Sequence, residues 1–440
     1  MRLERRGRAG QVNLDVNTRW VEELMERSEL AAKPFDIDKR LLMRAWERVR
    51  ANDGASGVDM VEVDEYAARW QDNLYRLWNR MSSGSYMPAP VRGVEIPKAD
   101  AGVRLLGVPT VNDRVAQTAV ALMVEQRVEP IFHRDSYGFR RGRSAHDALA
   151  VTRKRCWKFD WVIDLDIRAF FDSVPHELLM RAIEHHVSER WMLLCIQRWL
   201  VTPMQMPDGT TQQRTRGTPQ GSPISPVLAN LFMHYAFDMW MDRNYAACPF
   251  ERYADDVVVH CTTRHQAEHV LRMITDRMAQ LGLEVHPDKT HIVYCKDGRR
   301  RGKSSHTSFD FLGYRFAQRQ VNGPTGYFSG FTPAISPAAL KRINTTVRRW
   351  QVQRRTRHGL SDLAQMMNPH VRGWINYYGA YTRSALHSLA RRLERRLVAW
   401  AMRKYKRLRR SRTRAERFIA DIKQREPTLF AHWQLAQPAN

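Results

Sequence analysis

The feature that most restricts the fold of this 440-residue chain is a short apolar segment that carries two acids. Residues 161–167 read Trp-Val-Ile-Asp-Leu-Asp-Ile, a pattern typical of a buried strand. Because side chains alternate along a strand, Asp164 and Asp166 point to the same face. Two unpaired carboxylates on a buried strand are costly, so the fold must bring a cation or basic partners to them, or keep them protonated.

A second acidic pair lies further along the chain, in the segment Tyr253-Ala-Asp-Asp256 that leads into the β-branched residues 257–260. If this segment is the tip of a hairpin beside the first strand, then Asp166, Asp255 and Asp256 converge. Such an oxygen cluster suits Mg²⁺, which keeps some waters and takes further ligands from substrate phosphates. Two ions about 3.5–4 Å apart stabilise both oxygens of an in-line displacement, as nucleotidyl transfer requires. Taken singly, Asp255 and Asp256 also fit an ordinary surface turn or a helix cap, and Asp164 and Asp166 also fit pairing with arginines.

Five segments that include these acids follow one another along the chain: Asp166-Ile-Arg-Ala-Phe-Phe-Asp172, Arg216-Gly-Thr-Pro-Gln-Gly-Ser-Pro-Ile-Ser-Pro226, Tyr253-Ala-Asp-Asp256, Leu281-Gly-Leu-Glu-Val-His-Pro-Asp-Lys-Thr290 and Phe309-Asp-Phe-Leu-Gly-Tyr314. In this order they resemble the successive palm motifs of group II intron-encoded reverse transcriptases, also called maturases. The resemblance extends to Ile96-Pro-Lys98, Arg104-Leu-Leu-Gly-Val-Pro-Thr110, Asp113-Arg-Val-Ala-Gln117 and Ser136-Tyr-Gly-Phe-Arg-Arg-Gly-Arg-Ser144. It implies an α/β right-hand polymerase, in which fingers and palm form an antiparallel sheet with helices and an all-helical thumb/maturase domain follows.

The resemblance implies a metal site for two Mg²⁺ ions. Asp166 and Asp255 correspond to the principal metal ligands, Asp256 completes the acidic cluster, and the carbonyl of Ile167 offers a further oxygen. Asp164 matches a position that is not a strict ligand in the family, so we expect it to support the site from behind.

The resemblance also implies residues that hold the substrates. Lys98 and Arg104 match the cations of the fingers that bind the incoming triphosphate, and two cations beside a polyphosphate are electrostatically sensible. Phe171 matches the aromatic residue that blocks a 2′-hydroxyl, Gln220 lies in the loop beside the nascent base pair, and Lys289 matches a lysine that reaches the primer end or phosphates.

Four of these substrate residues also have a structural alternative. Phe171 also fits core packing, Gln220 fits a structural turn, and Lys98 and Arg104 fit ordinary surface cations. The sequence departs from the family at two positions where proline is usual, Leu105 after Arg104 and Arg141 after Arg140. These departures affect the expected rigidity of the loops and leave the acids unchanged.

The net charge of +25 identifies a class of partners. A large positive excess favours a polyanion such as RNA or DNA first, an anionic membrane surface second, and a merely basic enzyme third. Residues 381–426 contain 16 Lys and Arg against 4 Asp and Glu, with aromatic residues between them. A solvated helix face is the ordinary alternative, but such a charge excess repels itself unless a polyanion lies against it.

The sequence predicts three domains. They are an N-terminal helical extension at residues 1–50, fingers and palm at 51–325, and a helical thumb/maturase domain that binds RNA at 326–440. The segment 321–337 is rich in Gly, Pro and Ser, which is typical of a connector, and only helical patterning follows it. Tyr377, Tyr378 and Tyr381 lie in the part that resembles the thumb, where they fit either base stacking or a helix core.

Other classes of protein are not supported by the sequence. It has no secretory signal and no run of about 18 apolar residues, so we expect a soluble, cytoplasmic protein without a membrane partner. The five cysteines have no zinc-binding spacing, no Gly-Lys-Ser/Thr phosphate loop appears, and we expect no HNH-type endonuclease module.

The leading hypothesis is an RNA-directed DNA polymerase encoded by a group II intron, which also binds the intron RNA to assist splicing and mobility. Its expected partners are intron RNA, an RNA template with a DNA primer, and dNTPs. Two alternatives remain open: a related reverse transcriptase recruited to phage defence, and a non-catalytic RNA-binding splicing factor. The sequence leaves the oligomeric state open.

Overall fold

The computed structural model describes residues 34–97, 102–323 and 326–436. The chain divides into two compact units. In the described part, the first unit comprises residues 34–148 and 163–292, and the second unit comprises 149–162 and 293–436. This division differs from the three ranges expected from the sequence, and the assignment of fingers, palm and thumb to residues stays a prediction.

The elements alternate between helices and strands up to residue 335, and helices follow. In chain order they are α2 (Lys39–Asn52), α3 (Val63–Ala68), α4 (Trp70–Ser82), β1 (Val91–Pro97), β2 (Val103–Val108), α5 (Val111–Val128), η1 (Glu129–Ile131), α6 (Ala145–Cys156), β3 (Trp161–Leu165), α7 (Phe170–Ser173), α8 (His176–Glu184), α9 (Arg190–Val201), β4 (Met204–Gln205), β5 (Thr211–Gln212), α10 (Ser225–Met233), η2 (His234–Asp238), α11 (Met239–Asn244), β6 (Phe250–Tyr253), β7 (Asp256–Cys261), α12 (Arg264–Gln280), β8 (His291–Tyr294), β9 (Ser308–Phe311), β10 (Tyr314–Gly323), β11 (Gly326–Ile335), α13 (Pro337–Arg349), η3 (Val352–Arg354), α14 (Leu360–Tyr378), η4 (Arg383–Leu386), α15 (His387–Lys404), η5 (Lys406–Leu408), α16 (Arg412–Arg425) and η6 (Ala431–Ala436).

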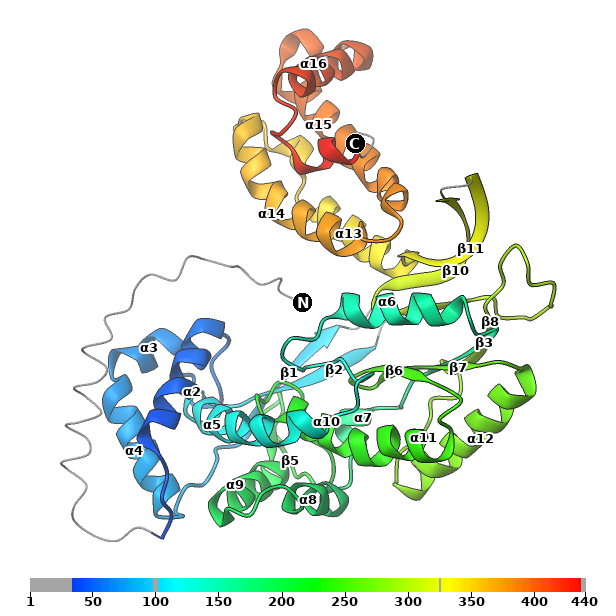
Figure 1. The fold of residues 1–440 in the computed structure, drawn as a ribbon. Coiled ribbons are helices and arrows are strands. Elements are labelled where there is room, and N and C mark those ends of the chain that lie inside the picture. Colours follow the sequence, from blue (N-terminus) through cyan, green and yellow to red (C-terminus); the bar gives the residue numbers. More distant parts are fainter. Residues whose placement is uncertain (1–33, 98–101, 324–325, 437–440) are drawn as a thin grey trace. The chain divides into compact units, whose positions relative to one another are not determined.

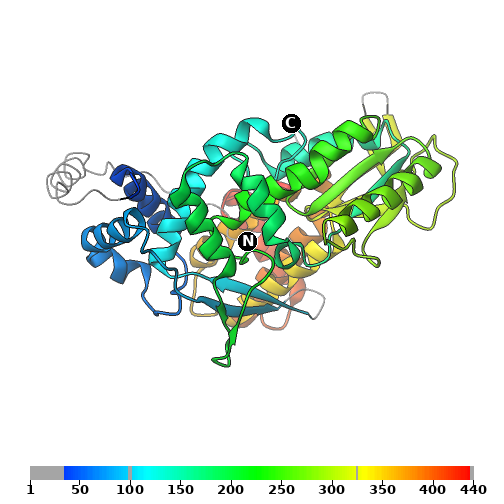
Figure 2. The ribbon, with the colours of Figure 1, turned by 90° about the horizontal axis from the view of Figure 1, so that it is seen from below.

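Helix α5 is the central helix of the first unit. It begins after Thr110, whose hydroxyl accepts a hydrogen bond from the backbone N–H of Asp113 and so caps the helix. Most of its residues are buried, and α2 and α4 pack against it. Figures 1 and 2 show α2, α3 and α4 grouped beside α5. The helical stretch expected at residues 66–81 is divided at Arg69, whose φ of −131° separates α3 from α4.

Two four-stranded sheets position the functional residues. One has the order β2-β1-β4-β5, with β1 and β2 antiparallel and β4 parallel to β1. The other has the order β6-β7-β3-β8, in which β6 and β7 form an antiparallel hairpin. The strands predicted at residues 91–97, 161–167 and 257–260 are therefore present as β1, β3 and β7, although β3 ends at Leu165.

The second unit corrects one expectation from the sequence. The segment 321–337, predicted to be a connector, instead forms much of a hairpin in which β10 pairs with β11 from Tyr314↔Ile335 to Gly323↔Gly326. Gly323 and Gly326 lie at the ends of the two strands, whereas aromatic and β-branched residues that favour strands occupy the rest of the hairpin. The composition of the segment combines these two parts and so hid the strands. The mixed α/β fold itself is confirmed.

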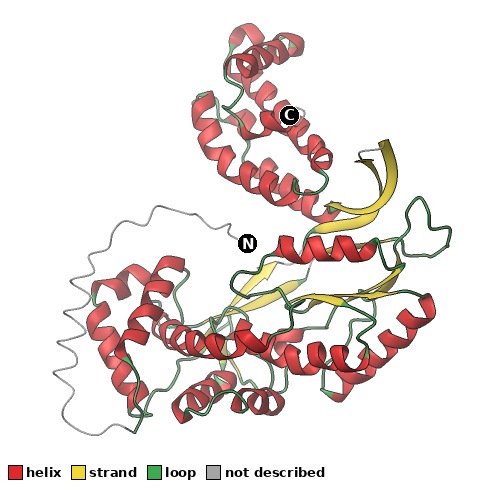
Figure 3. Ribbon diagram, viewed as in Figure 1, coloured by secondary structure: helices red, strands yellow, loops and turns green. Residues whose placement is uncertain are grey.

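The described residues after β11 form helices and no strand, as expected for the thumb/maturase region (Figure 3). Helix α13 begins with Ser336 as its cap and Pro337 in its first turn. A continuous apolar core joins α13 to α16 and contains the fully buried Trp400 and Trp433. No helix among the described residues has both the length and the apolar character needed to cross a membrane.

Candidate nucleotidyl-transfer site

The acids at 255 and 256 lie at the tip of the β6/β7 hairpin. Tyr253 pairs with Asp256, so Ala254 and Asp255 form a two-residue turn. Ala254 has a φ of +60°, a left-handed conformation that such tight turns require and that residues other than glycine rarely adopt. The hairpin expected from the sequence is therefore present, and the strained residue of its turn, Ala254, directly precedes Asp255.

The third acid, Asp166, follows directly after β3, which lies beside β7 in the sheet. Its backbone is anchored on both sides: the N–H of Asp166 lies 3.2 Å from the hydroxyl of Thr290, and its carbonyl accepts a 2.8 Å hydrogen bond from the N–H of His286. The next residue, Ile167, is buried and forms a bridge with Val285. The segment around residue 286 thus fixes the position of Asp166.

The carboxylates influence one another. Burial raises the pKa of Asp255 above its ordinary value, and the nearby charge of Asp166 adds to the shift. The pKa of Asp256 is raised to about 7, first because surrounding protein limits its hydration and then because Asp255 and Asp166 are negative. The Asp256 side chain nevertheless remains exposed to solvent. Lys289 and Arg104 oppose this shift.

Two of the predicted substrate cations lie within electrostatic reach of the acids. The Nζ of Lys289 is 3.3 Å from Oδ2 of Asp166, so this lysine is paired with a carboxylate. Arg104 is exposed on β2, and its positive charge partly offsets the rise in the pKa of both Asp255 and Asp256. Lys98, the other predicted triphosphate cation, lies outside the described residues.

The acids suit a metal that the substrate helps to hold. In the part of the chain that the structure describes, no three His, Cys, Asp or Glu residues form a group able to hold a metal ion by themselves. Mg²⁺ binds carboxylate oxygens, keeps several waters and usually takes other ligands from phosphates, so it does not need a closed protein cage. Mutually repelling carboxylates that remain open to solvent fit such an ion.

The loop that contains Gln220 contacts both the backbone of Phe171 and strand β2. The N–H of Thr218 donates a 2.7 Å hydrogen bond to the carbonyl of Phe171, and a Cβ on Gly217 would lie only 2.6 Å from that carbonyl. The carbonyl of Gln220 accepts a 2.7 Å hydrogen bond from Gly107 of β2. The Phe171 ring is partly exposed and meets the ring of the preceding phenylalanine edge-on.

The sequence analysis missed a buried network behind the hairpin. Arg252, just before the Tyr-Ala-Asp-Asp turn, forms a bidentate ion pair with Asp238 and contacts Asn230, and all three are buried. Asn230 also donates a 2.7 Å hydrogen bond to the carbonyl of Gly138. The available signal for this network was Arg252 itself, an arginine inside a four-residue strand whose other positions are mostly buried.

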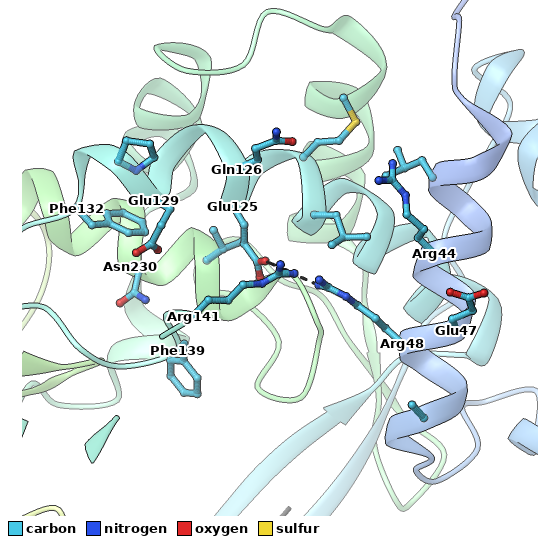
Figure 4. Close-up of a pocket in the computed structure, with 16 residues that line it drawn as sticks. Arg44, Glu47, Arg48, Glu125, Gln126, Glu129, Phe132, Phe139, Arg141 and Asn230 are labelled. Atoms are coloured by element: carbon cyan, nitrogen blue, oxygen red, sulfur yellow. Dashed lines mark ion pairs between the residues drawn. The ribbon is translucent and has the colours of Figure 1, made fainter. Parts of the chain in front are cut away.

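A separate pocket of about 820 Å³ lies in the first unit, between α2, α5 and the segment around Phe139 (Figure 4). None of the three acids lines it. Glu125 reaches Arg48 at 3.9 Å and Arg141 at 3.4 Å within this pocket, and the dashed lines of Figure 4 mark these ion pairs. Because its arginines face glutamates, the pocket offers no single sign of charge to a phosphate.

The tyrosines of the second unit surround Tyr314. The ring of Tyr314 lies 5.7 Å from that of Tyr377, 5.5 Å from that of Tyr378 and 5.6 Å from that of Tyr381. The hydroxyl of Tyr377 also donates to the carbonyl of Leu312. These rings therefore pack as a cluster, as the core alternative expected.

The sequence matches two protein families. Residues 96–316 match the family described as reverse transcriptase (RNA-dependent DNA polymerase), and residues 340–418 match the group II intron, maturase-specific domain. The first match covers half of the chain and includes every predicted site residue. The chain therefore belongs to the reverse transcriptase family, whose members are RNA-dependent DNA polymerases that use divalent metal ions.

Individual proteins give the same assignment. The chain is 31% identical to Protein YkfC of Escherichia coli over 304 residues, which cover 60% of this chain and 76% of that protein. It is 30% identical to the group II intron-encoded protein LtrA of Lactococcus lactis over 191 residues, 43% of this chain and 32% of LtrA. The chain thus combines a reverse transcriptase region with a region similar to the group II intron maturase-specific domain, and part of it is similar to a group II intron-encoded protein.

Among solved structures, a chain of telomerase from Candida albicans in complex with a fragment of telomeric RNA aligns with a TM-score of 0.45 and 11% sequence identity. The alignment covers 63% of this chain and 50% of that chain.

The chain spans about a third of the length of LtrA, and the rest of LtrA lies outside its alignment with this chain.

Proposed function

We propose that this protein catalyses Mg²⁺-dependent DNA synthesis on an RNA template at the acid cluster, and that its helical C-terminal region binds the intron RNA to assist splicing and mobility. The observation that carries the polymerase proposal is the convergence of Asp166, Asp255 and Asp256, with Arg104 and Lys289 within electrostatic reach. The substrates are a primed RNA template and dNTPs.

Each side chain has a proposed role in this reaction. Asp166 and Asp255 hold the metal, Asp256 completes the negative cluster, and the Ile167 carbonyl offers an oxygen beside it. When bound, a pair of Mg²⁺ ions supplies charge stabilisation for an in-line displacement. Lys289 balances part of the charge of Asp166 and presents its ammonium group to the primer phosphates, since its side chain is exposed.

The remaining residues select and hold the nucleotide. Arg104 extends from β2 with its guanidinium exposed, and this planar group can bind phosphate oxygens in pairs. Lys98 is proposed as its partner. The partly exposed ring of Phe171 excludes a 2′-hydroxyl by occupying its space, and the loop of Gln220 lies against the new base pair. The glycine contacts that fix this loop against Phe171 and β2 support its placement there.

The experiment for the polymerase proposal is the Asp255→Ala substitution. Incorporation of dNTPs on a primed RNA template with Mg²⁺ should fall by about 10³-fold or more, because the remaining acids cannot hold the ions in place. The affinity for RNA and the thermal unfolding profile should stay close to those of the unchanged protein. Incorporation that survives the substitution contradicts the proposal.

The RNA-binding proposal rests on the charge of residues 381–426. Most of the 16 Lys and Arg in this range are exposed, and they lie on α15, α16 and the turns around them. Counterion release then makes affinity for RNA fall steeply with salt. Binding should be measured with the intron RNA and with an unrelated RNA of equal length, from low to moderate salt. Affinity that stays constant over this range contradicts this use of the charge.

The intact acid cluster favours a catalytic protein over a splicing factor without polymerase activity. A role in phage defence differs in genetic context, so catalytic intron RNA encoded on either side of the gene is the distinguishing observation. The cytoplasmic location stays a prediction.

A further inference from the structure

The turn that carries Asp255 is held in a conformation that its own sequence does not favour. Ala254 has a φ of +60°, which costs free energy for a residue with a Cβ. The carboxylate of Asp255 follows directly, so its position depends on this turn staying in place. Strain of this kind persists only where surrounding structure determines the backbone.

One surrounding contact comes from Arg252. Its Nη1 donates a 3.0 Å hydrogen bond to the carbonyl of Ala254. The backbone of Arg252 is itself fixed, because its N–H donates to the backbone carbonyl of Asp135 at 2.9 Å and its carbonyl accepts from the backbone N–H of Tyr137 at 2.8 Å. A second contact comes from Gly138, which lies directly against the turn, because a Cβ there would be 2.4 Å from the nitrogen of Ala254.

The guanidinium of Arg252 is oriented by two further residues. Its Nε and Nη2 donate to the two carboxylate oxygens of Asp238 at 2.7 and 2.6 Å, and both side chains are 0% exposed. Its Nη1 also donates to Asn230 at 3.0 Å. Asn230, whose side chain lines the pocket of Figure 4, donates in turn to Gly138. The network thus fixes both groups that contact the turn, the guanidinium of Arg252 and the backbone of Gly138.

The helix that supplies Asp238 is irregular at this point. Residues His234–Asp238 form a π-helix between α10 and α11, and Asp238 is its last residue. Short π-helical segments within α-helices are rare and frequent at functional sites. The wider turn brings a carboxylate to Arg252 from the helix that packs behind the hairpin.

Stability alone is a weak explanation for this network. A buried ion pair often stabilises a fold no more than well-packed apolar residues of the same volume. What apolar residues cannot do is donate a hydrogen bond to the carbonyl of a strained turn. The contact between Arg252 and Ala254 therefore points to a role in geometry.

We propose that Arg252 is a positioning residue, which acts with Asp238 and Asn230 to hold the Ala254–Asp255 turn and so sets the place of the Asp255 carboxylate. This inference rests on the proposed function. Displacing a catalytic group by about 1 Å can cost about 100-fold in rate, so loss of the network should impair the metal-dependent step itself.

The test compares three variants of the full chain. Arg252→Lys keeps the charge but loses the paired contacts. Asn230→Ser removes the amide contacts with Arg252 and Gly138 and leaves the ion pair with Asp238. Arg127→Lys is the control. Arg127 pairs with Glu189 elsewhere in the first unit, also through a bidentate contact, although these two side chains are 33% and 31% exposed. The measurements are the rate of single-nucleotide incorporation per active site, counted from the first turnover, and the Mg²⁺ concentration that gives half of the maximal rate.

Arg252→Lys should lower the rate per active site by about 10- to 100-fold and raise the half-maximal Mg²⁺ concentration several-fold. Asn230→Ser should shift both in the same direction but less. Arg127→Lys should leave both unchanged, although it lowers thermal stability. A structural role alone would reduce the number of active sites and leave both quantities per site unchanged, and that result overturns the inference.

Two other outcomes also decide. If Arg252→Lys does not fold, Asn230→Ser alone carries the test by the same two quantities. If the unchanged protein incorporates no nucleotide, the proposed function fails, and the inference is then judged by Mn²⁺ binding measured by electron paramagnetic resonance. Weaker Mn²⁺ binding in Arg252→Lys or Asn230→Ser supports the inference, and binding equal to that of the unchanged protein overturns it.

Discussion

The two units of this protein use charge in opposite ways. In the first unit, three carboxylates converge and repel one another, and a buried arginine network fixes the turn that carries one of them. In the second unit, exposed arginines and lysines spread over α15, α16 and neighbouring turns with few acids among them. The proposed activity of the acids depends on where each carboxylate lies, whereas the proposed RNA affinity of the arginines and lysines depends on how many of them there are.

This difference determines how each region responds to change. A site that depends on position should lose its activity when one backbone contact moves, even if its net charge is unchanged. A surface that depends on number should lose affinity in steps, with each step also reducing the sensitivity to salt. The following predictions test this distinction, beginning with the largest expected effect.

Gly138→Ala should lower nucleotide incorporation by about 100-fold, because its Cβ would lie 2.4 Å from the nitrogen of Ala254 and displace the turn. Gly142→Ala is the control: a Cβ there meets nothing within 4 Å, so this variant introduces only the backbone strain of alanine at a φ of +70° in the same segment. Primer extension and RNA binding are measured for both. Equal nucleotide incorporation by the two variants would show that the activity does not depend on the position of the turn that carries Asp255.

Replacing Arg391, Arg395, Arg409 and Arg410 together by Gln should weaken RNA binding by about 10-fold at moderate salt. All four side chains are exposed. The slope of log affinity against log salt should fall by about 0.7 for each arginine that contacts a phosphate. Incorporation at saturating template should stay unchanged, and a large fall there would show that these arginines also serve the polymerase site.

Asp256→Asn should raise the melting temperature without metal, by about 2–3 °C at pH 8 and less at pH 5. The pKa of Asp256 in the fold is about 7, above its value in an unfolded chain, so the ionised group disfavours the fold. Its contribution to stability is full below pH 4 and is lost as the pH rises through 7. Mg²⁺ should stabilise the unchanged protein more than the variant, and thermal unfolding at both pH values measures this.

Glu189→Gln should lower the melting temperature by about 1–2 °C at pH 7. The hydrogen bond from Arg127 lowers the pKa of Glu189 to about 2, so this pairing stabilises the fold above the ordinary pKa of a glutamate. The difference from the unchanged protein should disappear as the pH falls from about 4 towards 2. The exposed pair of Arg412 and Glu416 on α16 is the comparison, and Glu416→Gln should change the melting temperature less.

Much of the site was predictable because its signals are local. The run 161–167 and the segment before residue 257 each carried acids into apolar strands, and their order along the chain matched a known series of motifs. The structure places β3 beside β7 and brings Lys289 to Asp166, in keeping with that reading.

What the sequence did not reveal depends on contacts between distant residues. Asp238 reads as an ordinary helical acid, and only the π-helical segment and the fold bring it to Arg252. Gly138 reads as a flexible loop residue, although its role is to leave space for Ala254. The β10/β11 hairpin was missed because a window of composition merges its glycine turn with the strands on either side.

The strand order β6-β7-β3-β8 has a consequence for biosynthesis. Strand β3 emerges from the ribosome well before its neighbours on either side, since β7 ends at Cys261 and β8 at Tyr294. Until then, an apolar strand that carries Asp164 and ends beside Asp166 has no sheet to enter. Sheets with such non-local pairing fold slowly and expose aggregation-prone surface. The rate at which residues 166–294 are translated, and any pause or chaperone that acts during this interval, will therefore affect how much active protein a cell obtains.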